Sequence, residues 1–179
     1  MTQLKCDCRG VFGTCTFNCA FWACGPCIER FKHCRPVISI DATHLYGKYK
    51  GKLLIVMATD DNNEVNPLMF AVVKSESKET WGWFLACLTQ FVTNRTNRYI
   101  ISDRHLGIKA CFDDTSITWL QLSKAHHRYC LCHVASNVNT KWKISKLKNL
   151  VWRVASMNQV KKFEATLELI RNVKPTAHR

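Results

Sequence analysis

The sequence lacks any apolar run near the about 20 residues that span a bilayer. The N-terminus, Met1 to Asp7, also lacks the apolar stretch of a signal peptide. These two absences predict an intracellular protein with no membrane segment, whose cysteines are reduced. Acidic residues become scarce toward the C-terminus, because only Glu164 and Glu168 follow Asp114.

The scarcity of acids makes the charge of the chain uneven. The net charge is +13. Residues 1–114 carry 14 basic and 11 acidic side chains, whereas residues 115–179 carry 12 basic and 2 acidic ones. This balance predicts a polyanionic partner, and nucleic acid is the commonest. A solvated basic helical surface is the alternative.

Cysteine is concentrated near the N-terminus. Seven of the 11 cysteines lie in the first 34 residues: Cys6, Cys8, Cys15, Cys19, Cys24, Cys27 and Cys34. Cys24-Gly25-Pro26-Cys27 could supply half of a zinc site, but no second C-x-x-C or histidine pair accompanies it. A thioredoxin-type redox pair follows a strand and opens a helix, and no preceding strand is evident. We therefore expect residues 1–34 to be an irregular, disordered or degenerate segment, with structural zinc the less favoured alternative.

The remaining pattern predicts a mixed α/β sheet. Strands are expected over 36–42, 52–59, 66–74 and 98–102, and helices over 77–93 and 106–112, with Ser77 as a cap. A loop is expected over 113–123, a strand that runs into a helix over 127–134, and helices beyond 135. The expected helical stripes are Leu147, Leu150, Val151 and Val154, then Val160, Phe163, Leu167 and Ile170. Three antiparallel strands followed by parallel strands with helical crossovers give an RNase H-like order.

Two aspartates stand at the ends of β-branched apolar runs. Asp41 follows Val37 to Ile40, and Asp103 follows Tyr99 to Ser102. In an RNase H-like order the strands that carry them are neighbours, so the carboxylates come together where such sheets place their chemistry. This predicts a divalent-metal site for phosphodiester chemistry. The alternative is that each aspartate only caps a helix or stabilises a turn.

With these residues in view, the chain resembles the transposase domain of Mutator-like elements of the plant type. The matching stretches are Arg35 to Tyr49, Asp60 to Ala71, Glu79 to Leu85, Ile101 to Arg104 with Gly107-Ile108, and Cys130 to His133 with Asn137. The resemblance runs almost continuously over residues 35–140, and residues 141–179 resemble the start of the helical region that follows in that family. It predicts three parts: the Cys-rich segment 1–34, an incomplete RNase H-like core 35–136, and a truncated helical insertion 137–179.

The resemblance implies a DDE-type recombinase for DNA strand cleavage and transfer. Asp41 and Asp103 would be its first two catalytic acids and would bind Mg²⁺ or Mn²⁺ in a two-metal site, with the ions about 4 Å apart. Cys130 and His133 match a C-x-x-H element, read either as local packing or as a metal contact, and Cys132 is incidental. His44, Lys48 and Arg104 are candidate DNA contacts, or ordinary surface groups.

The third acid of that family has no counterpart in its expected pattern. Glu164 is the default, and the alternative is that Glu164 and Glu168 lie on a solvated helix face, paired with Lys161 or Arg171. We therefore expect a fragment or decayed copy that binds metal weakly and DNA nonspecifically and is inactive alone. An open apolar sheet face near Ile40 and Ile101 would then favour self-association.

Two other functions remain open. One is a domesticated nuclear DNA-binding or regulatory protein derived from a transposase. The other is an RNase H-like nuclease that acts on RNA, which usually needs four acids. The resemblance implies a nuclear location.

Overall fold

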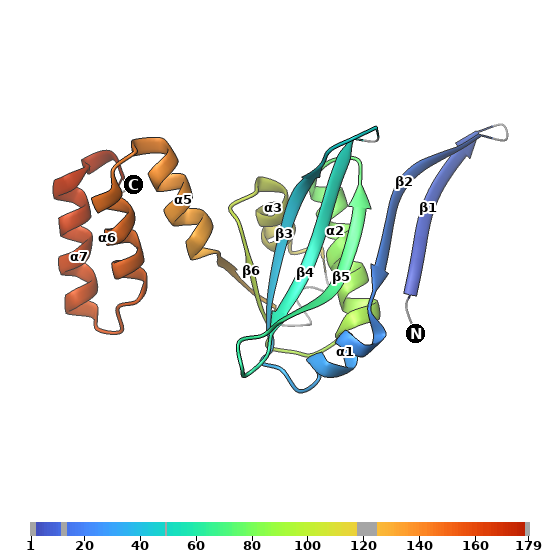
Figure 1. The fold of residues 1–179 in the computed structure, drawn as a ribbon, viewed down its shortest axis with the longest axis horizontal. Coiled ribbons are helices and arrows are strands. Elements are labelled where there is room, and N and C mark those ends of the chain that lie inside the picture. Colours follow the sequence, from blue (N-terminus) through green and yellow to red (C-terminus); the bar gives the residue numbers. More distant parts are fainter. Residues whose placement is uncertain (1–2, 12–13, 49, 118–124, 178–179) are drawn as a thin grey trace. The chain divides into compact units, whose positions relative to one another are not determined.

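The chain divides into two compact units, Met1–Arg128 and Tyr129–Arg179. The computed structural model describes residues 3–11, 14–48, 50–117 and 125–177. The first unit combines a sheet with helices, and the second is helical (Figure 1). The division by contacts falls after Arg128, and the boundary at 136 that the sequence suggested stays a prediction.

In the described part of the chain, the sheet has seven strands, which lie side by side in the order β1-β2-β5-β4-β3-β6-β7. The strands are β1 (Gln3–Val11), β2 (Thr14–Ala23), β3 (Val37–Leu45), β4 (Gly51–Thr59), β5 (Val65–Val73), β6 (Tyr99–Ser102) and β7 (His126–Tyr129). Strands β3, β4 and β5 form an antiparallel meander, and β6 pairs with β3 in parallel. The predicted mixed α/β class and the predicted neighbourhood of the two aspartate-bearing strands are both confirmed.

The helices of the described residues are α1 (Gly25–Phe31), α2 (Lys78–Cys87), α3 (Leu106–Asp113), α5 (Leu131–Trp142), α6 (Ser145–Ala155) and α7 (Val160–Val173). A π-helical turn, η1 (Leu88–Val92), continues α2, and a 3₁₀ turn, η2 (Pro175–Ala177), follows α7. Ser77 caps α2 as predicted, because its Oγ accepts a hydrogen bond from the Thr80 N–H at 3.2 Å. The loop expected over 113–123 lies partly outside the described residues.

Helices α2 and α3 cover one face of the sheet (Figure 1). Alternation along β3 turns Ile38 and Ile40 toward this face, and both are buried. They belong to one hydrophobic cluster with Trp81, Phe84 and Ile100. Trp81 and Phe84 meet edge to face with ring centroids 5.8 Å apart. This core fixes the position of α2 on β3 and β6.

The other face of the sheet is apolar but only half-buried, and no described helix of the first unit lies over its middle (Figure 1). Its half-buried apolar side chains are Leu53, Ile55, Met57, Phe70, Val72 and Ile101. An open face near Ile101 matches the expectation from the sequence. The same expectation was wrong for Ile40, which is 2% exposed because it shares the covered face with Ile38. Self-association through the open face stays a prediction.

The N-terminal segment is not irregular, which corrects the expectation for residues 1–34 over its described part. Strands β1 and β2 form an antiparallel hairpin, β2 pairs antiparallel with β5, and α1 follows. Cys19, Phe21 and Ala23 alternate along β2, and all three are buried. The segment showed no helical period because its period is two. Pairing with β5, which is distant in sequence, completes the strand.

The second unit has a small core of its own. Leu147, Leu150 and Ile170 are buried there, and Val151, Val154 and Leu167 pack against them. The first predicted stripe is therefore confirmed. The second predicted stripe included two side chains that the core does not bury, because Val160 is 73% exposed and Phe163 is 40% exposed. Among the described residues, no helix combines the length and apolarity that crossing a membrane requires.

Truncation of Phe84 tests the core that holds α2 on the sheet. Because Phe84 is fully buried, we expect Phe84→Ala to lower the free energy of unfolding by about 3–5 kcal/mol in chemical denaturation. Phe163→Ala is the matched control and is expected to cost less than about 1 kcal/mol, since that ring is partly in solvent. Equal losses for the two variants would contradict this core.

Asp114 gives the fold a defined acid sensitivity. Hydrogen bonds from Lys78 Nζ and from Ser116 hold the pKa of this carboxyl at about 2. A folded-state pKa below the ordinary value of 3.8 means that the charged carboxylate stabilises the fold above about pH 4. That stabilisation is lost as the pH falls from 4 to 2. We expect Asp114→Asn to flatten the pH dependence of stability in this window, measured by denaturation at stepped pH.

Asp61→Asn is the control for this acid sensitivity. Its ion pair with Arg35 is exposed to solvent, and such pairs contribute little to stability. We expect this variant to keep the pH dependence of the unchanged chain. An unchanged slope in Asp114→Asn would argue against the role of Lys78 and Ser116.

Candidate metal site and nucleic-acid surface

The parallel pairing of β3 with β6 aligns Asp41 with Asp103. The paired residues are Val37 with Tyr99, Ile38 with Ile100, and Ser39 with Ile101. Continuing this register by two residues sets Asp41 opposite Asp103, one residue past the end of β6. Neighbouring strands lie about 4.8 Å apart, and side chains two residues apart on a strand share a face. The two carboxylates therefore belong to the same face, opposite the one covered by α2 and α3.

Local hydrogen bonds orient both carboxylates. Asp41 Oδ1 accepts the N–H of Ala42 at 2.8 Å, and Asp103 Oδ1 accepts the N–H of His105 at 3.0 Å. The second bond belongs to the turn that leads into α3, where His105 is the N-cap residue. The turn-stabilising role considered for Asp103 is thus present in the fold. A carboxylate has a second oxygen and further lone pairs, so this bond leaves it able to bind a cation.

His127 is a neighbour of this site that sequence reasoning missed. Its ring stacks on Phe112 with centroids 4.5 Å apart, and its Nε2 lies 2.8 Å from Ser102 Oγ. Ser102 Oγ also donates to the carbonyl oxygen of Asp103 at 2.7 Å. Burial lowers the pKa of His127, while the charges of Asp113 and Asp103 act in the opposite direction. The sequence showed only a histidine in a short predicted strand. That pattern does not predict the contacts of His127 with Phe112 and Ser102.

A network of contacts between charged and histidine side chains lies at the carboxyl ends of β3 and β5. Lys52 Nζ donates to His44 Nε2 at 2.8 Å and pairs with Glu76 Oε1 at 2.8 Å. Glu76 Oε2 lies 3.7 Å from His105 Nε2. Glu76 and Lys52 were not singled out from the sequence, because their proximity depends on the register of β4 with β3 and β5.

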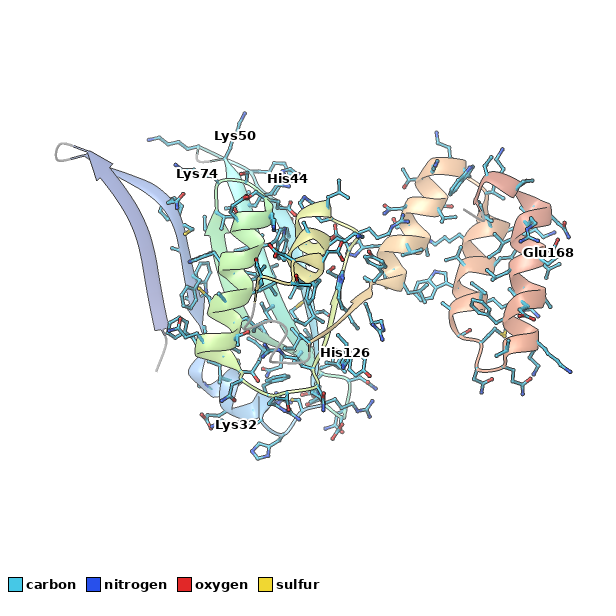
Figure 2. All side chains as sticks on the ribbon, turned by 180° about the vertical axis from the view of Figure 1, so that it is seen from behind. Lys32, His44, Lys50, Lys74, His126 and Glu168 are labelled. Atoms are coloured by element: carbon cyan, nitrogen blue, oxygen red, sulfur yellow. The ribbon has the colours of Figure 1, made fainter. Side chains whose placement is uncertain are left out.

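A basic pocket of about 430 Å³ adjoins this network, because His44 and Lys52 belong to both. Its lining includes His44, Tyr46, Lys50, Lys52 and Lys74. Figure 2 shows Lys50, Lys74 and His44 at the same end of the sheet, away from His126 and Lys32. An open pocket with three lysines suits an anion such as a backbone phosphate.

The candidate DNA contacts named from the sequence differ in their placement. His44 lines the basic pocket, whereas Lys48 and Arg104 are exposed and do not line it. Lys50, Lys52 and Lys74 were missed. Lys50 and Lys52 lie at the start of β4, and the pairing of β4 with β5 brings Lys74, the residue after Val73, beside them.

The remaining candidate site residues belong to the second unit. Cys130 is the residue before α5, His133 lies in its first turn, and Cys132 is exposed. Glu164 and Glu168 are exposed on α7, where Figure 2 labels Glu168. Glu168 pairs with Arg171 at 2.6 Å, which confirms the ion pair expected for a solvated helix face. Across the described ranges, no three His, Cys, Asp or Glu side chains cluster in a way that could hold a metal ion.

Comparison with known proteins identifies the family. The model of the MULE transposase domain matches residues 37–137, which is more than half of the chain. The chain belongs to this family. A search of curated proteins finds no match. The matched range contains Asp41, Asp103, Cys130 and His133.

Proposed function

We propose that this chain is a transposase-derived catalytic core, in which Asp41 and Asp103 are the first two acids of a DDE-type site for DNA strand cleavage and transfer. The observation that carries the proposal is the parallel pairing of β3 with β6, whose register aligns the two aspartates. The family match over residues 37–137 supports a transposase origin. The strand order supports an RNase H-like assignment, because a three-strand meander is followed by a strand parallel to its first member.

The donors at this site suit Mg²⁺ or Mn²⁺ in kind. Both are hard cations that prefer carboxylate oxygens, and two carboxylates share one face here. When bound, such ions activate an attacking water or hydroxyl and offset the charge that develops on a phosphate. Asp41 and Asp103 would hold them. The role of this chain would be to hold Asp41 within β3 and Asp103 directly after β6, and to support Asp103 through Ser102 and the N–H of His105.

Two acids form only part of a donor set. Three carboxylates are the usual minimum for a two-metal site, and no third carboxylate joins the pair among the described residues. Weak metal binding and no strand transfer by this chain alone are the expected consequences.

Binding of Mn²⁺ tests the pair directly. We expect Asp41→Asn and Asp103→Asn each to weaken binding of Mn²⁺ by at least about tenfold in a titration followed by electron paramagnetic resonance, because each removes one charged ligand. Asp61→Asn removes an equal charge from an exposed ion pair on the β4–β5 turn and should leave binding unchanged. Equal binding by all four proteins would remove the metal site from the proposal.

A nicking assay on supercoiled DNA in the presence of Mn²⁺ tests whether the set of catalytic carboxylates is complete. We expect no nicking above background. Robust nicking that Asp41→Asn abolishes would contradict the incomplete donor set, while supporting the assignment of Asp41.

DNA is the proposed partner, and the second unit is the proposed main contact. The described residues of α5, α6 and α7 carry many basic side chains and only two acidic ones, Glu164 and Glu168. Glu168 is already paired with Arg171. A surface of this composition attracts a phosphate backbone without reading its sequence. The basic pocket of the first unit offers a second place for phosphates.

The salt dependence of DNA binding tests this surface. We expect the double variant Lys146→Gln/Lys148→Gln on α6 to weaken binding to unrelated duplexes equally and to reduce the slope of log K against log salt by up to about 2. The charge-matched control is Lys32→Gln/Lys109→Gln, whose lysines pair with Glu29 and Asp113 in the first unit. An equal change of slope in the two double variants would show that net charge acts, and not the helical surface.

A regulatory DNA-binding protein of transposase origin is the second candidate. The observation that favours it is the separation of the basic helices from the aspartate pair into two units. Asp41→Asn and Asp103→Asn variants that keep both full DNA affinity and unchanged Mn²⁺ binding would favour this function, because the first candidate requires the aspartates to bind the metal. Both candidates act on DNA, so we propose a nuclear location for either.

A further inference from the structure

The Cys24-Gly25-Pro26-Cys27 motif lies in the setting that a thiol–disulfide exchange pair requires. From the sequence, no strand was evident before it. The structure corrects this expectation, because β2 ends at Ala23 and α1 begins at Gly25. Cys24 is the residue that joins them, and Cys27 lies in the first helical turn with Pro26 before it. Residues three apart across a helical turn face the same side, so the two sulfur atoms are neighbours.

Hydrogen bonds within the motif distinguish the two thiols. The N–H and the thiol of Cys27 both hydrogen bond to the sulfur of Cys24, and they lower the pKa of Cys24. Burial, followed by the interaction with Cys24, raises the pKa of Cys27. Both side chains are partly exposed. Cys24 is thus the more readily ionised thiol, and a thiolate is the form that attacks a disulfide.

The backbone of the motif is anchored to β5 on both sides. The N–H of Cys24 donates to the carbonyl of Leu68 at 3.3 Å, and Asn66 Nδ2 donates to the carbonyl of Cys27 at 3.0 Å. Asn66 is buried, and Cys27 packs against the main hydrophobic core. The two cysteines therefore keep their relative position while solvent reaches the sulfur atoms.

The nearby described cysteines are poorer partners for either thiol. Cys19 and Cys34 are buried, and Cys34 Sγ donates to the carbonyl of Arg30 at 3.5 Å. Within the part of the chain that the structure describes, no third His, Cys, Asp or Glu joins the pair to complete a metal site. Exchange between Cys24 and Cys27 is the chemistry that this arrangement favours over zinc binding.

We propose that Cys24 and Cys27 are a redox-active pair that a low-molecular-mass disulfide such as glutathione disulfide oxidises. The Cys24 thiolate attacks one sulfur of that disulfide, so that a mixed disulfide forms and one thiolate leaves and takes up a proton. The Cys27 thiol then loses its proton to solvent and attacks the sulfur of Cys24. The Cys24–Cys27 disulfide forms and the second small thiolate leaves, so two protein thiols are oxidised and one small disulfide is reduced to two thiols. This activity is independent of the function proposed for the aspartates.

Peptide mapping of the full chain tests the product. The protein is equilibrated with glutathione and glutathione disulfide at several ratios, quenched with acid, alkylated and cut with chymotrypsin. Cleavage after Trp22 and Phe31 isolates the peptide Ala23–Phe31, whose only cysteines are Cys24 and Cys27. We expect an internal disulfide in this peptide that rises with the disulfide ratio and disappears with dithiothreitol. Absence of that disulfide at every ratio, or its formation only with other cysteines, would overturn the proposal.

Single variants test the order of attack. In Cys27→Ala, the mixed disulfide of glutathione on Cys24 should accumulate, because the resolving thiol is missing. In Cys24→Ala, the mixed disulfide on Cys27 should form about tenfold more slowly at pH 7. Cys132→Ser removes an exposed thiol of the second unit and is the matched control, with the Cys24–Cys27 disulfide expected unchanged. Equal rates at Cys24 and Cys27, or stoichiometric zinc held by both thiols in the purified chain, would contradict the assignment.

Discussion

The parallel pairing of β3 with β6 is the constraint on which the candidate site depends. In the chain, two antiparallel strands and a helix separate these strands, so bringing them together costs loop-closure entropy. Burial of apolar side chains between them and the helices offsets this cost. Ile38 and Ile100 are opposite each other in the register, and both lie in the same hydrophobic cluster as Trp81 and Phe84. The alignment of Asp41 with Asp103 is a consequence of packing on the opposite face from the carboxylates.

Strand alternation then divides the chemistry of the sheet between its faces. The face with Ile38 and Ile40 is closed by α2 and α3, and the face with Asp41 is only half-buried. A one-residue slip of β3 would exchange the two sets, burying a carboxylate and exposing isoleucine. The cost of that exchange specifies the register strongly. The position of the carboxylates is therefore determined by the core, even though neither carboxylate contributes to it.

The sequence predicted those parts of the molecule that local pattern controls. The runs that carry Asp41 and Asp103, the Ser77 cap and the stripe through Leu147 and Leu150 all follow from periodicity or from capping chemistry. The hairpin of β1 and β2 was missed because its main support is β5, which is distant in sequence. The contacts of Glu76 with Lys52 and His105 were missed for the same reason. Periodicity also overestimated the second helical stripe, because it identifies an apolar face without showing how much of that face a neighbour covers.

The aspartate pair and most of the excess positive charge lie in different units. Under the proposed function, metal chemistry and DNA attraction could therefore be lost separately. The first unit holds the aspartate pair and carries 16 basic and 11 acidic side chains. The second unit holds most of the excess positive charge and needs only a small core around Leu147 and Ile170. Attraction to a polyanion depends on many weak and interchangeable contacts, so single substitutions reduce it gradually. A metal site depends on a few carboxylates in fixed positions, so one missing acid abolishes its chemistry. Under the proposed function, DNA binding would therefore outlast catalysis wherever one acid of the set is missing.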